Sequence, residues 1–168
     1  EVFTDAIYYD YFMAQYEDDV EQQREILEQI IEINPSTRYL RDLAVVYLRL
    51  DDRQSFNTLF EHYMENEQDP DQITNFVLNI MKNGHIEVGT QLIASLIADE
   101  QAQPLLYVTY AIYCEDESRA RETLETAIDR YPDDQLIALA NLQQDQLLPN
   151  MRRDPGKLPI ILESNGLL

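Results

Sequence analysis

The chain is poor in cysteine, glycine, tryptophan and long apolar runs, and these shortages exclude several kinds of site. Cys114 is the single cysteine, so no disulfide can form within the chain, and no CxxC or Cys/His cluster indicates a structural metal site. The four glycines stand apart, so no glycine-rich loop is available to bind a phosphate. No apolar run reaches the roughly 18 residues of a transmembrane helix, and no signal-like segment follows Glu1. Both the cytoplasm and the periplasm stay open as compartments.

Basic residues are also scarce. The chain has 12 Lys and Arg against 32 Asp and Glu, which gives a net charge of -20. Nucleic acids and anionic membranes are bound through strongly basic surfaces, so we expect neither nucleic-acid binding nor direct membrane insertion. The hydrophobic content of 45% is still sufficient for a folded core in a chain of 168 residues.

Recognisable catalytic patterns are absent from the sequence. A carboxylate that precedes a helical segment caps its exposed amides, and this explains the acidic clusters at 18–19, 51–52, 115–117 and 133–134. His62 and His85 belong to no HExxH or Ser/His/Asp arrangement and are predicted at the surface or in a turn. Cys114 stands where a buried hydrophobic residue is expected. We therefore predict no catalytic residue, no metal and no cofactor.

What the sequence does contain is a helical pattern that recurs about every 33 residues. The clearest copy has a turn at Gly84 between two segments with apolar residues at helical spacing, and Gly89 interrupts the second segment. Glycine inside a helix costs about 1 kcal/mol relative to alanine, so we predict that Gly89 lies at a close contact between helices. Similar copies begin at Leu40 and Tyr107, and a more degenerate one opens the chain. Repetition of this length indicates stacked helical hairpins.

The copies resemble the tetratricopeptide repeat, a helix-turn-helix unit of about 34 residues. Ala120, Leu124, Ala127 and Pro132 match the second-helix signature of that family, and the resemblance covers roughly residues 4–134. It implies an all-α fold, a right-handed superhelical solenoid of antiparallel helix pairs. The sequence places the helices at 4–17, 20–33, 37–50, 53–66, 70–83, 86–99, 101–114 and 117–130.

A capping helix and a tail are predicted after the repeats. Apolar residues recur at helical spacing from Leu136 to Leu147 and predict a solubilising C-terminal cap, so the repeat domain is expected over 1–147. The remaining residues, 148–168, contain three prolines and are predicted to be extended. Part of this tail is apolar and is expected to pack on the terminal repeat or on a neighbouring subunit, giving an oligomer in the second case, through Leu158, Ile160, Ile161 and Leu162.

The resemblance also implies a partner-binding surface, the concave face formed by the first helix of each repeat. Gln15 and Val45 are among its contact positions, and the residues expected to bind the partner are Tyr8, Phe12, Tyr16, Arg38, Arg41, Leu48, Arg49, Leu78, Met81, Lys82, Leu105, Ile112 and Tyr113. This surface is aromatic and apolar with a basic middle, which suits a peptide or helix that is apolar and carries an acidic group. The alternative is that the arginines pair with acidic residues of the same chain.

The function that we predict from the sequence is a non-enzymatic scaffold or adaptor. It would bind a peptide or helix of another protein in the concave groove, as a component of a larger assembly. Two alternatives share this fold. One is a secretion-type chaperone or an assembly factor of a multi-protein machine, and the other is a regulatory domain of a larger enzyme whose catalytic part lies outside this chain.

Overall fold

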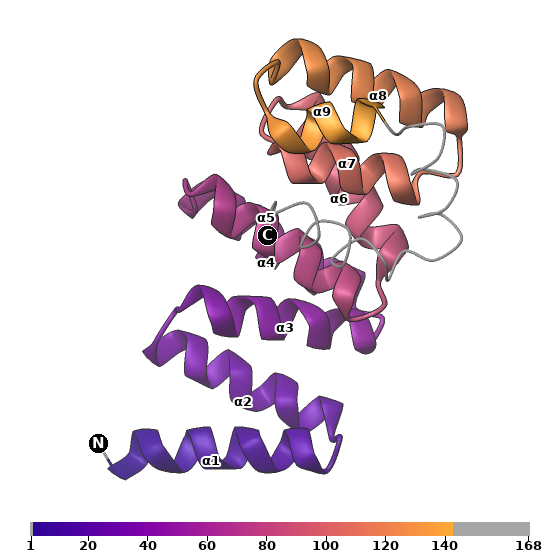
Figure 1. Ribbon diagram of the computed structural model, residues 1–168. Coiled ribbons are helices and arrows are strands. Elements are labelled where there is room, and N and C mark those ends of the chain that lie inside the picture. The colour runs from indigo at the N-terminus through magenta and orange to yellow at the C-terminus, as the bar shows by residue number, and fades with distance from the viewer. Residues whose placement is uncertain (1, 143–168) are drawn as a thin grey trace. The chain divides into compact units, whose positions relative to one another are not determined.

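The computed structural model describes residues 2–142, and this part of the chain is all-helical with no strand (Figure 1). Its helices are α1 (Val2–Tyr16), α2 (Val20–Ile33), α3 (Thr37–Arg49), α4 (Arg53–Asn66), α5 (Pro70–Lys82), α6 (Ile86–Ala98), α7 (Pro104–Tyr113), α8 (Glu117–Arg130) and α9 (Gln135–Leu142). Their positions confirm the predicted all-α fold and the predicted order of the helices along the chain. The largest shift is at α7, which begins at Pro104 rather than at the predicted residue 101, because proline is favoured in the first turn of a helix.

The described residues divide into two compact units, 2–85 and 86–142. In the first unit α1 packs on α2, α2 on α3 and α3 on α4, and α3 also contacts α5. In the second unit α6 packs on α7, α7 on α8 and α8 on α9, and α7 also contacts α9. In each unit consecutive helices thus pack on one another, and one helix also contacts the second helix after it, as α3 contacts α5 and α7 contacts α9. This arrangement is compatible with a helical repeat. The single domain predicted over 1–147 stays a prediction.

The 33-residue period is visible in the backbone of three turns. Asp18, Asp51 and Gly84 follow one another at intervals of 33 residues and have φ of 56°, 57° and 92°. Each donates its N–H to the carbonyl three residues back, and the next residue donates to the carbonyl five residues back. These paired bonds end a helix in a left-handed residue, a conformation that glycine adopts freely and aspartate tolerates. The turn explains Gly84, while Gly89 is buried within α6.

Substitution of Gly84 tests this turn. Gly84→Ala is expected to destabilise the protein by about 1–2 kcal/mol, because an alanine in the left-handed region is strained. Crowding does not contribute, since a Cβ at residue 84 would meet nothing within 4 Å. Gly84→Asn is the matched control and should cost less, because asparagine tolerates positive φ. Urea denaturation measures both, and an equal cost for the two variants would contradict the conformational explanation.

The acidic clusters cap helices, as predicted from the sequence. The carboxylate of Asp19 accepts a hydrogen bond from the N–H of Gln22, and that of Asp52 accepts one from Ser55, each at 3.0 Å. Equivalent bonds are made at the starts of α8 and α9 by Asp116 and Asp134. Hydrogen bonds from Ser55 hold the pKa of Asp52 below its ordinary value. These carboxylates therefore have a structural role at helix N-termini.

The predicted cap and tail are only partly within the described residues. Helix α9 forms as predicted after Pro132 and buries Ile137 and Ala140. Leu147 lies outside the described residues, and so does the whole predicted tail, 148–168, with its expected contact residues Leu158, Ile160, Ile161 and Leu162.

Candidate partner-binding surfaces

A polar hollow of about 140 Å³ lies between the first helices of the first unit. Helices α1, α3 and α5 supply most of its lining, and α2 contributes one glutamine. We call it the first-helix hollow, lined by Tyr11, Gln15, Gln23, Asp42, Val45, Val46, Arg49, Asn79 and Asn83. It brings together side chains from three predicted repeats. Of the residues that the sequence assigned to the concave face, Gln15, Val45 and Arg49 line this hollow.

A hydrogen-bonded chain crosses the hollow from α1 to α3. The hydroxyl of Tyr11 donates to Oδ2 of Asp42 at 3.2 Å, and Nε2 of Gln15 donates to the Tyr11 oxygen at 3.0 Å. Burial raises the pKa of the Asp42 carboxyl, although its bond from Tyr11 acts in the opposite direction. Burial and the neighbouring Asp42 also raise the pKa of Tyr11 above its ordinary value. Tyr11 therefore keeps its proton and acts as the donor.

Arg49 forms an exposed ion pair at the hollow. Its Nη2 lies 2.6 Å from Oδ1 of Asp18, and the two side chains are 36% and 75% exposed. Pairs this exposed are typically worth at most about 1 kcal/mol. The sequence-based alternative, in which the arginines pair within the chain, is thus realised at Arg49. A partner carboxylate could replace Asp18 at small cost.

Amide side chains complete the hollow on its α5 side. Nδ2 of Asn83 donates to the backbone oxygen of Asn79 at 2.8 Å. Together with Gln15 these residues offer both donors and acceptors, which is the combination that a peptide backbone requires. The sequence analysis missed both asparagines, because they fall outside the contact positions that the resemblance assigns.

Exposed aromatic side chains extend along α1. Phe12 and Tyr16 were predicted at the concave face, and they are 62% and 80% exposed. Tyr9, which was not predicted, is 63% exposed. Tyr8 is only half-buried and stacks on Tyr39, with ring centroids 5.6 Å apart. Large apolar side chains left in water in this way are typical of surfaces that contact another molecule.

Three of the predicted contact residues belong instead to the core. Leu48, Met81 and Ile112 are only 7%, 5% and 2% exposed, so a partner cannot reach them in this conformation. Leu78, Leu105 and Tyr113 are half-buried, while Lys82 is exposed. Leu105, Ile112 and Tyr113 belong to the second unit, so the structure places them only relative to that unit.

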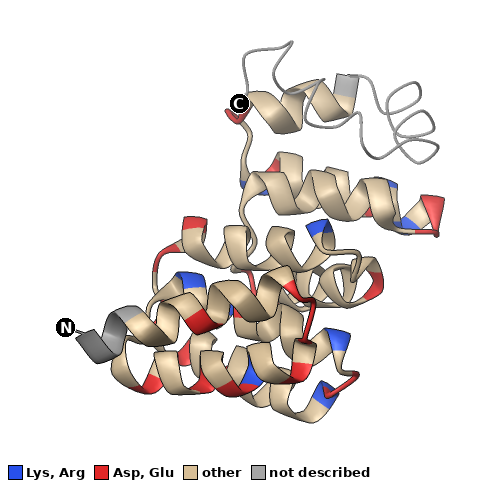
Figure 2. Cartoon of the chain, turned by 90° about the horizontal axis from the view of Figure 1, so that it is seen from below, with Lys and Arg blue, Asp and Glu red and all other residues tan. Residues whose placement is uncertain are grey.

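The predicted basic patch is spread over different environments. Arg38 is exposed, with its guanidinium carbon 5.9 Å from the ring centroid of Tyr39. Arg41 is half-buried and Arg49 lies at the first-helix hollow. Figure 2 places many acidic residues at helix ends and turns, in keeping with the capping bonds described above.

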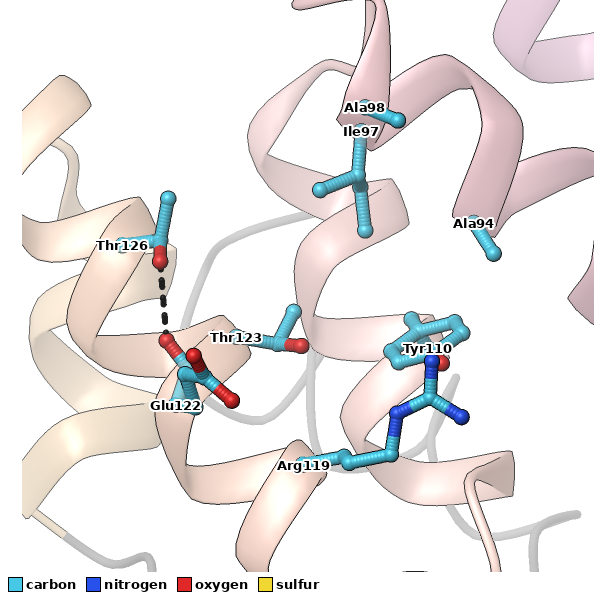
Figure 3. A pocket seen from close by; sticks show the side chains of 8 residues that line it. All are labelled: Ala94, Ile97, Ala98, Tyr110, Arg119, Glu122, Thr123 and Thr126. Atoms are coloured by element: carbon cyan, nitrogen blue, oxygen red, sulfur yellow. Dashed lines mark hydrogen bonds between the residues drawn. The ribbon is translucent and has the colours of Figure 1, made fainter.

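A second hollow of about 240 Å³ lies in the second unit, between α6 and α8 (Figure 3). Tyr110 of α7 lies between these helices, and the Arg119 side chain extends next to its ring. Burial raises the pKa of Tyr110. Thr126 Oγ1 donates to the backbone oxygen of Glu122 at 2.9 Å. The sequence analysis did not anticipate this hollow.

Within residues 2–142 the structure offers no group of acidic, histidine and cysteine side chains able to hold a metal ion. His62 is exposed, His85 is half-buried in a turn, and Cys114 is buried with its thiol intact. No helix in that part of the chain is long and apolar enough to cross a membrane.

Comparison of the chain with protein-family models, with curated proteins and with solved structures found no match. Within residues 2–142 the structure by itself shows an all-helical fold in which consecutive helices pack in pairs.

Proposed function

We propose that this protein is a tetratricopeptide-like scaffold without enzymatic activity, which binds a peptide or helix of another protein on its first-helix side. The observation that carries the proposal is the first-helix hollow, where Arg49 and the amides of Asn79 and Asn83 lie beside the hydrogen-bonded pair of Tyr11 and Asp42. Repeat scaffolds of stacked helical hairpins commonly work through an extended surface of this kind.

The chemistry of the hollow suits an acidic group on an otherwise apolar segment. Arg49 can form two parallel hydrogen bonds with a carboxylate, and its present partner, Asp18, is an exposed carboxylate in a weak pair. The amides would hold the backbone of the bound segment. Phe12 and Tyr16 on α1 would cover its apolar side chains. The protein would then be one component of a larger assembly.

Charge reversal at the arginines tests this proposal. The double variant Arg41→Glu, Arg49→Glu should weaken the complex at least tenfold, or about 1.4 kcal/mol. Two positive charges would be replaced by negative ones that repel the acidic group of the partner. The partner would first be captured from native lysate, identified by mass spectrometry and purified, and its affinity would then be measured by calorimetry.

The control is the single variant Arg53→Glu, which is compared with the single variant Arg49→Glu because both make the same charge change in the same unit. Arg53 is exposed at the start of α4 and does not line the first-helix hollow. Equal weakening by the control, or unchanged affinity in the folded double variant, would show that recognition lies elsewhere on the chain.

A further inference from the structure

A larger groove lies on the second helices of the first unit and shares no lining residue with the first-helix hollow. It runs between α2 and α4 over α3, and its main part measures about 450 Å³. A second part, of about 340 Å³, shares Leu40 and His62 with the first and reaches Tyr63 and Glu67. We call the two parts together the α2–α4 groove.

The length of the groove is set by α4. Its lining includes Gln54 near the start of this helix and Asn66 at the end. Helix α4 has 14 residues, so the groove extends for about 20 Å at 1.5 Å per residue. This length would accommodate roughly four turns of a partner helix.

The lining of the groove is mainly apolar and contains one unsatisfied polar group. Ile31, Leu40 and Leu59 line the main part, and all three are half-buried. Tyr63 is 3% exposed, and its hydroxyl has no hydrogen-bond partner among the described residues. Because this hydroxyl is buried, an occupant of the groove would contact the apolar lining and would not bond to the hydroxyl.

The charged residues that line the groove are acidic. They are Glu28 and Glu67, and neither part of the lining contains a lysine or arginine. Glu28 accepts a hydrogen bond from the hydroxyl of Tyr47 at 3.0 Å, and Glu67 accepts one from the backbone N–H of Asp69 at 3.0 Å. These bonds orient both carboxylates, and each leaves an oxygen for a cation.

We propose that the α2–α4 groove binds an amphipathic helix of a partner protein whose apolar face carries flanking lysines or arginines. Glu28 and Glu67 would pair with these cations, while Leu40 and Leu59 would cover the apolar face. This partner is opposite in charge to the one proposed for the first-helix hollow, so the protein would link two different segments.

Comparison with the hollow of the second unit separates what recurs in both units from what is found in the α2–α4 groove. Thr58 and His62 of α4 correspond to Glu122 and Thr126 of α8, each pair being 64 residues apart. A hollow between second helices therefore recurs at the same repeat position (Figure 3). Its lining does not recur, since Arg119 and Thr123 stand where the first unit has Ser55 and Leu59. Arg119 lines the hollow of the second unit, whereas the charged residues that line the α2–α4 groove are all acidic.

The test uses the full chain and two synthetic amphipathic helices of about 14 residues, the length of α4. One contains leucine and lysine, and the other leucine and glutamate. The lysine peptide should shift the methyl resonances of Ile31, Leu40 and Leu59, and the glutamate peptide should not. The double variant Glu28→Gln, Glu67→Gln should weaken binding of the lysine peptide at least tenfold.

A tryptophan placed in the groove tests whether the lysine peptide binds there. Thr58→Trp would fill it from the exposed face of α4, whereas Asn57→Trp places the same side chain at a neighbouring exposed residue outside the lining. The chain contains no tryptophan, so fluorescence reports on each inserted ring directly. Thr58→Trp should reduce affinity for the lysine peptide at least tenfold, and Asn57→Trp should leave it unchanged.

Three outcomes would overturn the proposal. The lysine peptide could shift the aromatic resonances of Tyr9, Phe12 and Tyr16 in place of the groove methyls. The folded Thr58→Trp variant could bind as well as the unmodified chain, or the glutamate peptide could bind as tightly as the lysine peptide. The Arg49→Glu variant, changed at the first-helix hollow alone, should still bind the lysine peptide, so failure of the first-helix proposal would be recognised separately.

Discussion

Replacing Phe76 by alanine is expected to lower the free energy of unfolding by about 3–5 kcal/mol. Phe76 of α5 is completely buried, and its ring centroid lies 4.5 Å from that of Tyr63 and 5.5 Å from that of Phe60. Both partners belong to α4, so the substitution removes the aromatic contact between the two helices. The closer of these rings, Tyr63, is itself only 3% exposed and is therefore too tightly packed to move into the space.

Urea denaturation followed by circular dichroism measures this loss, and hydrogen exchange at α4 and α5 amides locates it. The matched control is Asn75→Ala, at the preceding exposed residue of the same helix, which should change stability by less than about 0.5 kcal/mol. A loss below about 1 kcal/mol for Phe76→Ala would contradict the burial of its ring in the core.

The second large effect is expected in the second unit, where Leu124→Ala should cost about 2–5 kcal/mol. Leu124 of α8 is 1% exposed, and Ala120 and Ala127 on the same helix are completely buried. Helix α8 packs on α7 through this face. Ala120 and Ala127, the buried neighbours of Leu124 on its own helix, are too short to fill the cavity, which favours the upper part of the range.

Thermal unfolding measures the loss at Leu124, with Glu125→Ala as the control on the exposed side of α8. The control should remain within about 0.5 kcal/mol of the unmodified protein. If Leu124→Ala unfolded at the same temperature as the control, the face of α8 that contains Ala120, Leu124 and Ala127 would not be packed in the core.

The turns and helix starts were predictable because their causes are local. Asp19, Asp52 and Asp116 bond to amides two or three residues ahead, so the sequence alone contains both partners. Gly84 likewise adopts a left-handed turn that depends on the residue itself and the helix before it. Helix positions followed from apolar spacing, which the described helices confirm.

The candidate sites were less predictable. Phe12 and Tyr16 are exposed as expected, but Leu48 and Met81, assigned to the same surface by the resemblance, are buried. The first-helix hollow depends on Tyr11 meeting Asp42 across 31 residues of sequence. The α2–α4 groove has no signal in the local pattern, since its lining comes from three helices and each contributes half-buried residues that look like ordinary core positions.

The sequence by itself determined the all-helical class, the order and approximate limits of the helices and the acidic residues that cap several of them. It also determined the acidic charge, which restricts the partners. The tertiary structure alone decided which side chains are exposed and which meet in a hollow. The physical reason is that hydrogen bonding along a helix joins residues at most a few positions apart, whereas the exposure of Leu48, Asn79 or Leu59 depends on helices far away in the chain.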